Sequence, residues 1–507
     1  MELETIPRRH PVNASVANSG AISRPLMRCY HMLPSNRKLI LFICEALIIF
    51  FVYTSLFGML EKDALPGSQV FALMLLYALA YIAGKLVSLI WLPPLLGMIA
   101  AGFVFQKVPF DTYNHNISRQ WAFNLRSAAF VIILLQAGLE LNTKKIETLD
   151  LVAYRLAFLP CVIEIITSTI SSHFLMQLPW SWSIMFGFII SGVSSTILFP
   201  SLIHVQERTM INKRGLPSFL TATASLNNAL SIIGFSAMLA PSFSGNEPTI
   251  FVATKFITDF GSGVLGGSIF GYLFCHMLRS QSNSSKKTML PFYHTALIFL
   301  GGFTGLFLAK KFDVLGAGPI ICFMLGFITS LIWKGKPQHL EDIKEILNVI
   351  WNLIQPIFFG LVGSEVSLDE LDTDLGSMIL ALLIGFECRV LSTTFGSCGG
   401  HFSMKNKFFI SATWFSKSTL QAAAAPLVLE YASNKETEIK EYAVKVLVGS
   451  VLSILITAPI GAVLITKFGP MLLTHENDRS EPDPLEENIA EANNTSFRPR
   501  QIEDTYF

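Results

Sequence analysis

Apolar segments of spanning length recur along the whole chain, and they constrain its fold more than any other feature. A helix needs about 20 mostly apolar residues to cross the hydrocarbon core of a bilayer. About fourteen segments meet this length, and they start near Leu39, Gln69, Leu92, Gln120, Leu149, Trp180, Leu216, Thr249, Met289, Val314, Ile346, Leu375, Phe408 and Tyr442. Because a helix satisfies its own backbone hydrogen bonds in lipid, the sequence predicts an all-α polytopic membrane protein with about 14 transmembrane helices.

The composition agrees with this class and excludes others. Of the 507 residues, 51% are hydrophobic and only 14% are charged, whereas soluble proteins carry roughly 25% charged residues. The net charge is +1, so the chain lacks the basic surface that nucleic-acid binding requires. The sequence also lacks the common catalytic motifs, so we expect neither an enzyme nor a bound cofactor or metal.

The chain divides into two polar tails and a membrane domain. Residues 1–38 are polar and contain several arginines, and residues 474–507 are polar and acidic. We expect both tails to be disordered and cytoplasmic. Between them, residues 39–473 form the predicted transmembrane domain. It consists of an extra helix at 39–60, a first repeat at 69–239, a linker helix at 249–278 and a second repeat at 289–470.

Loop charges predict the orientation of the chain. With both termini in the cytoplasm, basic residues gather in the inner loops, as the positive-inside rule requires. They are Lys144, Lys145, Arg208, Lys213, Arg214, Arg279, Lys286, Lys287, Lys334, Lys336, Lys405 and Lys407. Lys310 and Lys311 fall outside and depart from the rule. Asn116, in the sequence Asn-Ile-Ser, also falls outside and is a predicted glycosylation site.

Two predicted spans share a string of small hydroxyl residues followed by proline. The first contains Ser194, Ser195 and Thr196 before Pro200, and the second contains Lys417, Ser418 and Thr419 before Pro426. Proline frees a backbone carbonyl. The two spans are the sixth and the thirteenth, and an odd offset gives them opposite orientations. This is typical of secondary transporters with inverted repeats and two broken helices.

Polar and charged residues are costly inside a membrane and mark candidate sites. Asn227 and Asn228 lie at the middle of the seventh span, and Glu164, Arg389 and Lys417 lie on spans near the broken helices. The asparagines form either helix–helix hydrogen bonds or part of an ion site. Glu164 and Arg389 form either a structural ion pair or part of a transport pathway. Lys417 either caps a broken helix in the place of an ion or takes part in transport.

At these residues the chain resembles a known family of transporters. The segments that carry the resemblance include LPCVIE (159–164), WSWSIMFGFIISGVSSTILFPS (180–201), GLPSFLTATASLNNALSIIGF (215–235), CRVLSTTF (388–395) and KSTLQAAAAPL (417–427). They resemble the animal NHA branch, sodium/hydrogen exchanger 9B-like, of the monovalent cation/proton antiporters. Bacterial NhaA-type exchangers are relatives of this branch.

The resemblance implies a homodimer with an NhaA-type inverted repeat, an elevator-like core and exchange of Na⁺ or Li⁺ for H⁺. Glu164 and Arg389 match the family's charged pair, and Lys417 matches its lysine at the helix crossing. The family's ion site is an aspartate pair in the seventh span, where this chain has Asn227-Asn228. Asn has no titratable proton and no formal charge, so this departure bears directly on ion coupling.

The sequence therefore favours a secondary active ion transporter of the Na⁺(Li⁺)/H⁺ antiporter type with an altered ion site. One alternative is a proton-coupled anion (Cl⁻) transporter, in which positive groups and half-helix N-termini hold the anion. Another is a membrane interaction protein that does not transport. The predicted location is the plasma membrane or an intracellular organelle membrane.

Overall fold

The computed structural model describes residues 37–107, 117–141, 149–194, 197–198, 202, 216–245, 248–281, 289–366, 375–399, 404–417 and 419–469. Within these residues the chain is helical and contains no strand. Several positions named from the sequence lie outside them: Asn116, Ser195, Thr196, Pro200, Ser418, residues 1–36 of the predicted N-terminal tail and the predicted C-terminal tail.

The chain divides into two units, Met1–Leu65 and Pro66–Phe507. In the first unit, α2 (Arg37–Leu60) leads into the short helix η1 (Glu61–Ala64). The hydroxyl of Tyr53 donates a hydrogen bond to the carbonyl of Ala64 at 3.1 Å. Large apolar side chains of α2 are exposed, including Ile48 at 62%, so this helix is suited to a lipid surrounding.

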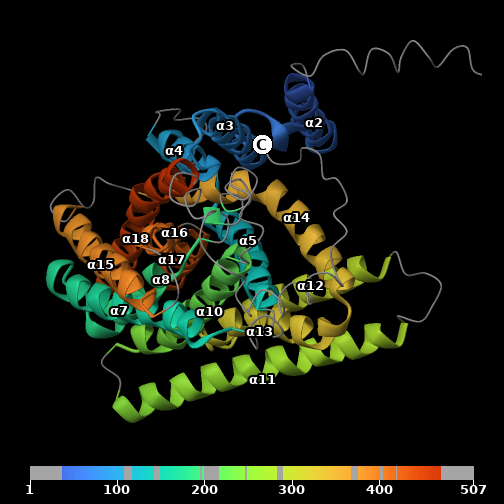
Figure 1. Cartoon of the computed structure of the whole chain (residues 1–507). Helices are drawn as coiled ribbons and strands as arrows, with labels where there is room; N and C mark the ends of the chain where they lie inside the picture. The colour runs from blue at the N-terminus through green and yellow to red at the C-terminus, as the bar shows by residue number, and fades with distance from the viewer. Residues whose placement is uncertain are drawn as a thin grey trace, which may run out of the picture. The chain divides into compact units, whose positions relative to one another are not determined.

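Fourteen labelled α-helices of the second unit are described (Figure 1). They are α3 (Gln69–Leu89), α4 (Pro94–Lys107), α5 (Arg119–Glu140), α7 (Leu151–Leu175), α8 (Trp180–Ser191), α10 (Leu216–Phe243), α11 (Thr249–Gln281), α12 (Leu290–Lys311), α13 (Ala317–Ile332), α14 (Pro337–Ser364), α15 (Leu375–Gly396), α16 (Met404–Thr413), α17 (Thr419–Ala432) and α18 (Thr437–Val463). A 3₁₀ turn, η5 (Trp333–Gly335), precedes α14, and η7 (Leu464–Phe468) extends α18 as a π-helix.

In the described part of the chain, 11 helices are long and apolar enough to cross a membrane, and α4 and α8 are shorter apolar helices. Helices α16 and α17 together occupy the predicted thirteenth span. The chain is an integral, multi-pass membrane protein, and the count of 14 spans stays a prediction. The helix that contains the predicted eleventh span begins at Pro337, ahead of the predicted start of the span near Ile346, because the polar first turns of α14 continue the same helix.

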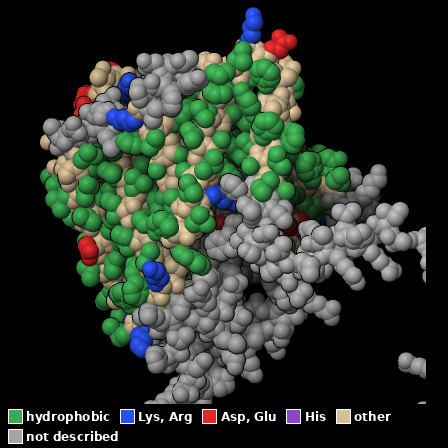
Figure 2. Space-filling view, turned by 90° about the horizontal axis from the view of Figure 1, so that it is seen from above, with side chains coloured by type: hydrophobic (Ala, Val, Ile, Leu, Met, Phe, Trp, Pro, Cys, Tyr) green, Lys and Arg blue, Asp and Glu red, His purple; other side chains and the backbone are tan. Residues whose placement is uncertain are grey.

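Hydrophobic side chains cover most of the described surface on the face drawn in Figure 2, and charged side chains there are few and scattered. Single apolar side chains are also exposed: Leu265 of α11 is 63% exposed and Phe395 of α15 is 70% exposed. Exposed apolar surface of this extent is a liability in water, whereas in a bilayer it contacts lipid. The surface therefore agrees with the membrane class that the composition predicts.

The helices of the second unit pack in two groups. The first, called the core group here, consists of α7, α8, α10, α15, α16, α17 and α18. The second, called the scaffold group, consists of α3, α4, α5, α11, α12, α13 and α14. Figure 1 shows α7 beside α15 in the core group and α11 beside α13 in the scaffold group. Helices α10 and α17 of the core group contact α5, α11 and α13 of the scaffold group.

Glycines let backbones of the scaffold group touch. A Cβ atom on Gly102 of α4 would lie 2.0 Å from the carbonyl oxygen of Gly360 on α14. A Cβ atom on Gly138 of α5 would lie 2.3 Å from the carbonyl oxygen of Phe323 on α13. Small residues at helix contacts are how membrane helices gain close packing without a hydrophobic driving force. Any larger residue at either position would push the two helices apart.

Candidate functional site

Two helices of the core group are interrupted, and their interruptions meet. Helix α8 ends at Ser191 and the chain continues in an extended conformation from Gly192. Helix α16 ends at Thr413 and α17 begins at Thr419. The backbone N–H of Ser194 donates to the carbonyl of Ser416 at 3.0 Å, so one interruption is hydrogen-bonded to the other. With 12, 10 and 14 residues, these helices are each shorter than the about 20 residues of a full span.

The second proline of the sequence pattern does not mark the interruption. Pro426 lies inside α17, whose helix continues to Ala432. The described break comes earlier, between Thr413 and Thr419. Prolines within membrane helices are tolerated because neighbouring groups satisfy the freed backbone. The Ser-Thr string is therefore the better indicator of the second break.

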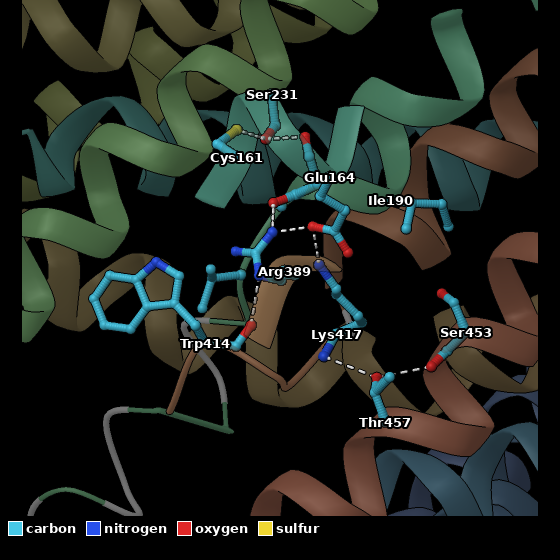
Figure 3. A network of polar contacts seen from close by, with 12 residues as sticks. Cys161, Glu164, Ile190, Ser231, Arg389, Trp414, Lys417, Ser453 and Thr457 are labelled. Atoms are coloured by element: carbon cyan, nitrogen blue, oxygen red, sulfur yellow. Dashed lines mark hydrogen bonds and ion pairs between the residues drawn. The ribbon is translucent and has the colours of Figure 1, made fainter. Parts of the chain in front are cut away.

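Three charged side chains from different elements meet beside the interruptions (Figure 3). The carboxylate of Glu164 on α7 accepts a hydrogen bond from the guanidinium of Arg389 on α15. The same oxygen accepts one from the ammonium of Lys417 at 2.8 Å. All three side chains are at most 1% exposed. With one carboxylate and two cations, the cluster carries a formal charge of −1 + 2 = +1.

Arg389 connects the cluster to both broken helices. Its Nη1 donates to the carbonyl of Ser191, at the end of α8, at 2.9 Å. Its Nε donates to the carbonyl of Trp414, just after α16, at 2.8 Å. A guanidinium has five N–H donors in a fixed plane. With its further contacts to Glu164 and Asn227, Arg389 therefore joins α7, α8, α10 and the chain just after α16. The geometry makes Arg389 the centre of the polar network.

Asn227 and Asn228 of α10 are hydrogen-bonded within the same network. Asn227 Oδ1 accepts from Arg389 Nη2 at 3.1 Å, and its Nδ2 donates to the carbonyl of Ser191 at 3.0 Å. Asn228 Oδ1 accepts from the backbone N–H of Val193 at 2.8 Å. Both side chains are buried, at 0% and 7% exposure. The structure therefore joins both asparagines to the end of α8.

Lys417 lies on the non-helical segment between α16 and α17. Its backbone N–H donates to the hydroxyl of Thr457 on α18 at 3.1 Å, and that hydroxyl donates to the carbonyl of Ser453 at 2.7 Å (Figure 3). Its ammonium points to Glu164. A cation just before a helix N-terminus faces the positive end of the dipole. The carboxylate of Glu164 offsets this repulsion.

The hydroxyl residues named from the sequence have different places. Ser194 accepts a hydrogen bond from the backbone N–H of Ile197 at 3.2 Å, and Thr419 begins α17 partly buried. Ser195, Thr196 and Ser418 lie outside the described residues. Of the five described site residues with charged or amide side chains, Glu164, Asn227, Arg389 and Lys417 form one connected network, and Asn228 contacts the chain next to it.

Sequence reasoning missed Gln421. This residue lies in the first turn of α17 and is 1% exposed, and its amide nitrogen reaches the carbonyls of Ile189, Ile190 and Gly192. The signal was a lone glutamine in an apolar span, one turn after Lys417. Among the described residues, no group of three or more His, Cys, Asp and Glu side chains could hold a metal ion.

Comparisons with known proteins identify the family of the chain. A family model described as "Sodium/hydrogen exchanger, transmembrane" matches residues 40–469. Sodium/hydrogen exchanger 9B1 of Macaca fascicularis is 33% identical over 461 residues, which cover 90% of this chain and 88% of that protein. Sodium/hydrogen exchanger 9B2 of Mus musculus is 34% identical over 451 residues, covering 87% of this chain and 80% of that protein.

A solved structure shares the fold. The sodium proton antiporter MjNhaP1 from Methanocaldococcus jannaschii, determined at pH 8, superimposes with a TM-score of 0.63. The match covers 80% of this chain and 98% of that one at 17% sequence identity. At this identity, the similarity concerns the path of the backbone.

Proposed function

The chain belongs to the sodium/hydrogen exchanger family, and from this premise we propose that it is a secondary active transporter of the Na⁺(Li⁺)/H⁺ antiporter type. One observation carries the proposal. A buried charged network of Glu164, Arg389 and Lys417 lies where two interrupted helices meet. Charged groups inside a membrane are rare and usually line ion pathways, and interrupted helices are where transporters bind their ions.

The order of the core helices supports an NhaA-type inverted repeat within a protein of 14 spans. In this proposal, α7, α8 and α10 are the last three labelled helices of the first repeat (69–239), and α15, α16–α17 and α18 are the last part of the second repeat (289–470). The interrupted segment is then the middle one of these three in each repeat. The hydrogen bond between Ser194 and Ser416 lies where the two interruptions cross, which is the place expected for the pseudo-two-fold axis.

Proton coupling needs a group that changes charge. The asparagines cannot do this, and arginine stays protonated in proteins. Lys417 can release a proton, which would change the charge of the network from +1 to 0. In our proposal, a cation enters when Lys417 has lost its proton, because the repulsion is then smaller. Glu164 anchors the network by contacting both Arg389 and Lys417.

Asp259 is less suitable than Lys417 as the group that couples proton movement to cation movement. It lies on α11 of the scaffold group, and its Oδ2 accepts a hydrogen bond from the backbone N–H of Gly316 at 3.1 Å. This contact ties α11 to the chain just before α13. Asp259 is 2% exposed and stands apart from the interrupted helices. Its described contacts support a role in holding the scaffold group together.

Each of the two alternative functions is favoured by a separate observation. The formal charge of +1 in the network, with Asn227 and Asn228 in place of aspartates, favours a proton-coupled anion (Cl⁻) transporter. The hydrogen bonds that use both asparagine oxygens favour a protein that no longer transports. The homodimer stays an expectation that rests on the resemblance to the family.

Flux measurements in proteoliposomes distinguish these functions. A pH-sensitive dye reports proton movement while Na⁺, Li⁺, K⁺ or Cl⁻ gradients are imposed, with protein-free liposomes as the control. We expect a Na⁺ or Li⁺ gradient to drive proton flux in the wild type. Asn228→Asp should increase that flux, because it adds a titratable carboxylate. Flux that follows only the Cl⁻ gradient would support the anion transporter, and no flux under any gradient would support the interaction protein.

A further inference from the structure

The charged network hydrogen-bonds only part of the backbone carbonyls at the end of α8. The last four carbonyls of a helix have no partner within it, and in α8 they belong to Phe188, Ile189, Ile190 and Ser191. They are buried in a membrane protein, so each needs a donor from elsewhere. The carbonyl of Gly192 follows them directly in the extended chain.

Three side chains satisfy the first and the last of these carbonyls. The hydroxyl of Ser191 donates to the carbonyl of Phe188 at 2.9 Å. Arg389 and Asn227 donate to the carbonyl of Ser191 at 2.9 and 3.0 Å. The carbonyls of Ile189 and Ile190, and that of Gly192, remain to be satisfied.

One side chain from the other interrupted helix reaches all three. Gln421 Nε2 lies 2.9 Å from the carbonyl oxygen of Ile189, 3.3 Å from that of Ile190 and 3.0 Å from that of Gly192. An amide nitrogen has only two hydrogens, so three oxygens share two donors. The three oxygens therefore converge on a single point more closely than two hydrogen bonds require.

Backbone carbonyl oxygens that converge on one point can coordinate a cation. Carbonyl oxygens replace the hydration shell of monovalent cations in selectivity filters, and carbonyls of unwound helices coordinate them in transporters. The C-terminal end of α8 adds the negative end of a helix dipole. The amide nitrogen of Gln421, with its partial positive charge, occupies the point where a cation would be held.

We propose that Gln421 is a specificity-determining residue whose amide occupies a three-carbonyl cage for a monovalent cation at the end of α8. The inference deepens the proposed function and rests on it. A cation that enters the network must displace the amide to gain these carbonyls. The side chain of Gln421 therefore sets how strongly the interrupted helices hold a cation, while it joins α17 to α8.

Thermal unfolding of the purified protein tests the cage without relying on transport. The Tm of the wild type and of Gln421→Ala is measured in NaCl, LiCl, KCl and RbCl, with choline chloride at the same ionic strength as the reference. Gln421→Ala should be less stable than the wild type in choline chloride. A ligand that binds only the folded state raises the Tm, so the alkali cations should restore part of the loss. We expect a cation-dependent rise at least about twice that of the wild type.

Two further variants complete the test. Ser242→Ala is the matched control, because Ser242 donates to the carbonyl of Ser181 at 3.1 Å near the start of α8. It should lower the Tm with no added response to cations. Gln421→Asn keeps the amide but shortens the side chain, and it should fold and give an intermediate response.

The outcome separates the cage from a structural hydrogen bond. If Gln421→Ala and Gln421→Asn respond to cations only as the wild type and Ser242→Ala do, water fills the space and the inference is overturned. If Gln421→Ala does not fold, the response of Gln421→Asn alone decides. A wild type without any ion flux would contradict the proposed function, whereas a cation response of the Gln421 variants would still support the cage.

Discussion

Glu164 and Glu430 are both paired with a lysine, but their surroundings differ. Glu164 lies at the interrupted helices, where it contacts two cations and where none of the three side chains is more than 1% exposed. Glu430 lies near the end of α17 and pairs with Lys310 of α12 at 3.2 Å, and the side chain of Lys310 is 34% exposed. The first cluster lies within the core group, and the second pair joins the core group to the scaffold group.

The difference shows what each contact can do. A buried charge without its partner is strongly destabilising, so the charges at the interrupted helices must stay together. In the second pair the side chain of Lys310 is 34% exposed and that of Glu430 is 9% exposed, so water can replace the carboxylate as a partner of the ammonium and the pair is worth less than a fully buried one. The pair between the two groups can therefore separate at a lower cost than the buried cluster. This suits a boundary between groups that move relative to each other, as the proposed transport requires.

In the predicted orientation, Lys310 also departs from the charge rule for loops, and its contacts give a reason. Its ammonium pairs with Glu430 and lies 3.8 Å from the centre of the Phe123 ring on α5. A cation over an aromatic face is attracted by the ring. The positive charge is thus compensated within the protein. The structure gives no comparable reason for Lys311.

The largest effect is expected at the buried pair. Glu164→Gln and Arg389→Gln should each lower the free energy of unfolding by about 3–5 kcal/mol. The first leaves the buried cations Arg389 and Lys417 without their carboxylate. The second leaves Glu164 with Lys417 alone and removes the hydrogen bonds of the guanidinium to Asn227 and to the carbonyls of Ser191 and Trp414. The double variant should recover part of the loss. Thermal and denaturant unfolding in detergent measure the three values. Strictly additive losses would show that the two side chains do not act as a pair.

A smaller effect is expected at the neutral member of the network. Asn227→Ala removes the acceptor for Arg389 and a donor to the carbonyl of Ser191, and an unsatisfied buried group costs about 1–3 kcal/mol. The free energy of unfolding should fall by this amount, less than for Glu164→Gln. A loss as large as that of Glu164→Gln would show that removing a charged member of the network is no more destabilising than removing a neutral one.

The ion pair within the scaffold group comes next. Arg126 of α5 donates to Glu365 at 2.8 Å, with side-chain exposures of 7% and 29%. Glu365→Gln should cost about 1–2 kcal/mol, because the nearly buried Arg126 loses its charged partner while the side-chain oxygen of the glutamine can still accept a hydrogen bond from it. Circular dichroism during heating measures the change. An unchanged unfolding curve would place this pair with fully solvated ones.

The smallest effect is expected at the pair between the groups. Glu430→Gln should change stability by at most about 1 kcal/mol, because Lys310 keeps its contact with water and with the ring of Phe123. Glu341→Gln removes a pair with Lys344 on the exposed side of α14 and is the matched control, with about 0.5 kcal/mol expected. A loss at Glu430 as large as that at Glu164 would remove the distinction between the two regions.

The sequence predicted the helices better than their ends. Apolar segments are long and numerous, so their positions follow from composition, as the first helix and α18 illustrate. The start of α14 at Pro337 was missed because its polar first turns resemble a loop. The break before α17 was indicated by the Ser-Thr string, whereas Pro426 pointed to a position inside the helix.

The site was predictable where its residues are rare. Glu164, Arg389 and Lys417 stand out because charges seldom occur in spanning segments. Their exact partners do not follow from the sequence, because every residue carries a carbonyl and no pattern tells which one Arg389 or Gln421 will contact. Such contacts depend on where α8 ends in space, and that is fixed only when both interrupted helices are in place.

The interrupted end of α8 has a consequence for how the chain is made. Two of the donors that satisfy it come late: Arg389 lies 198 residues after Ser191, and Gln421 lies 232 residues after Ile189. At about 5–20 residues per second, ribosomes need about 10–50 s to supply them. During this time the carbonyls of Ile189 and Ile190, which Gln421 will contact, require water or the insertion machinery as a partner. Helix α8 therefore reaches its final position in the membrane late in biosynthesis, after Arg389 and Gln421 have been synthesised.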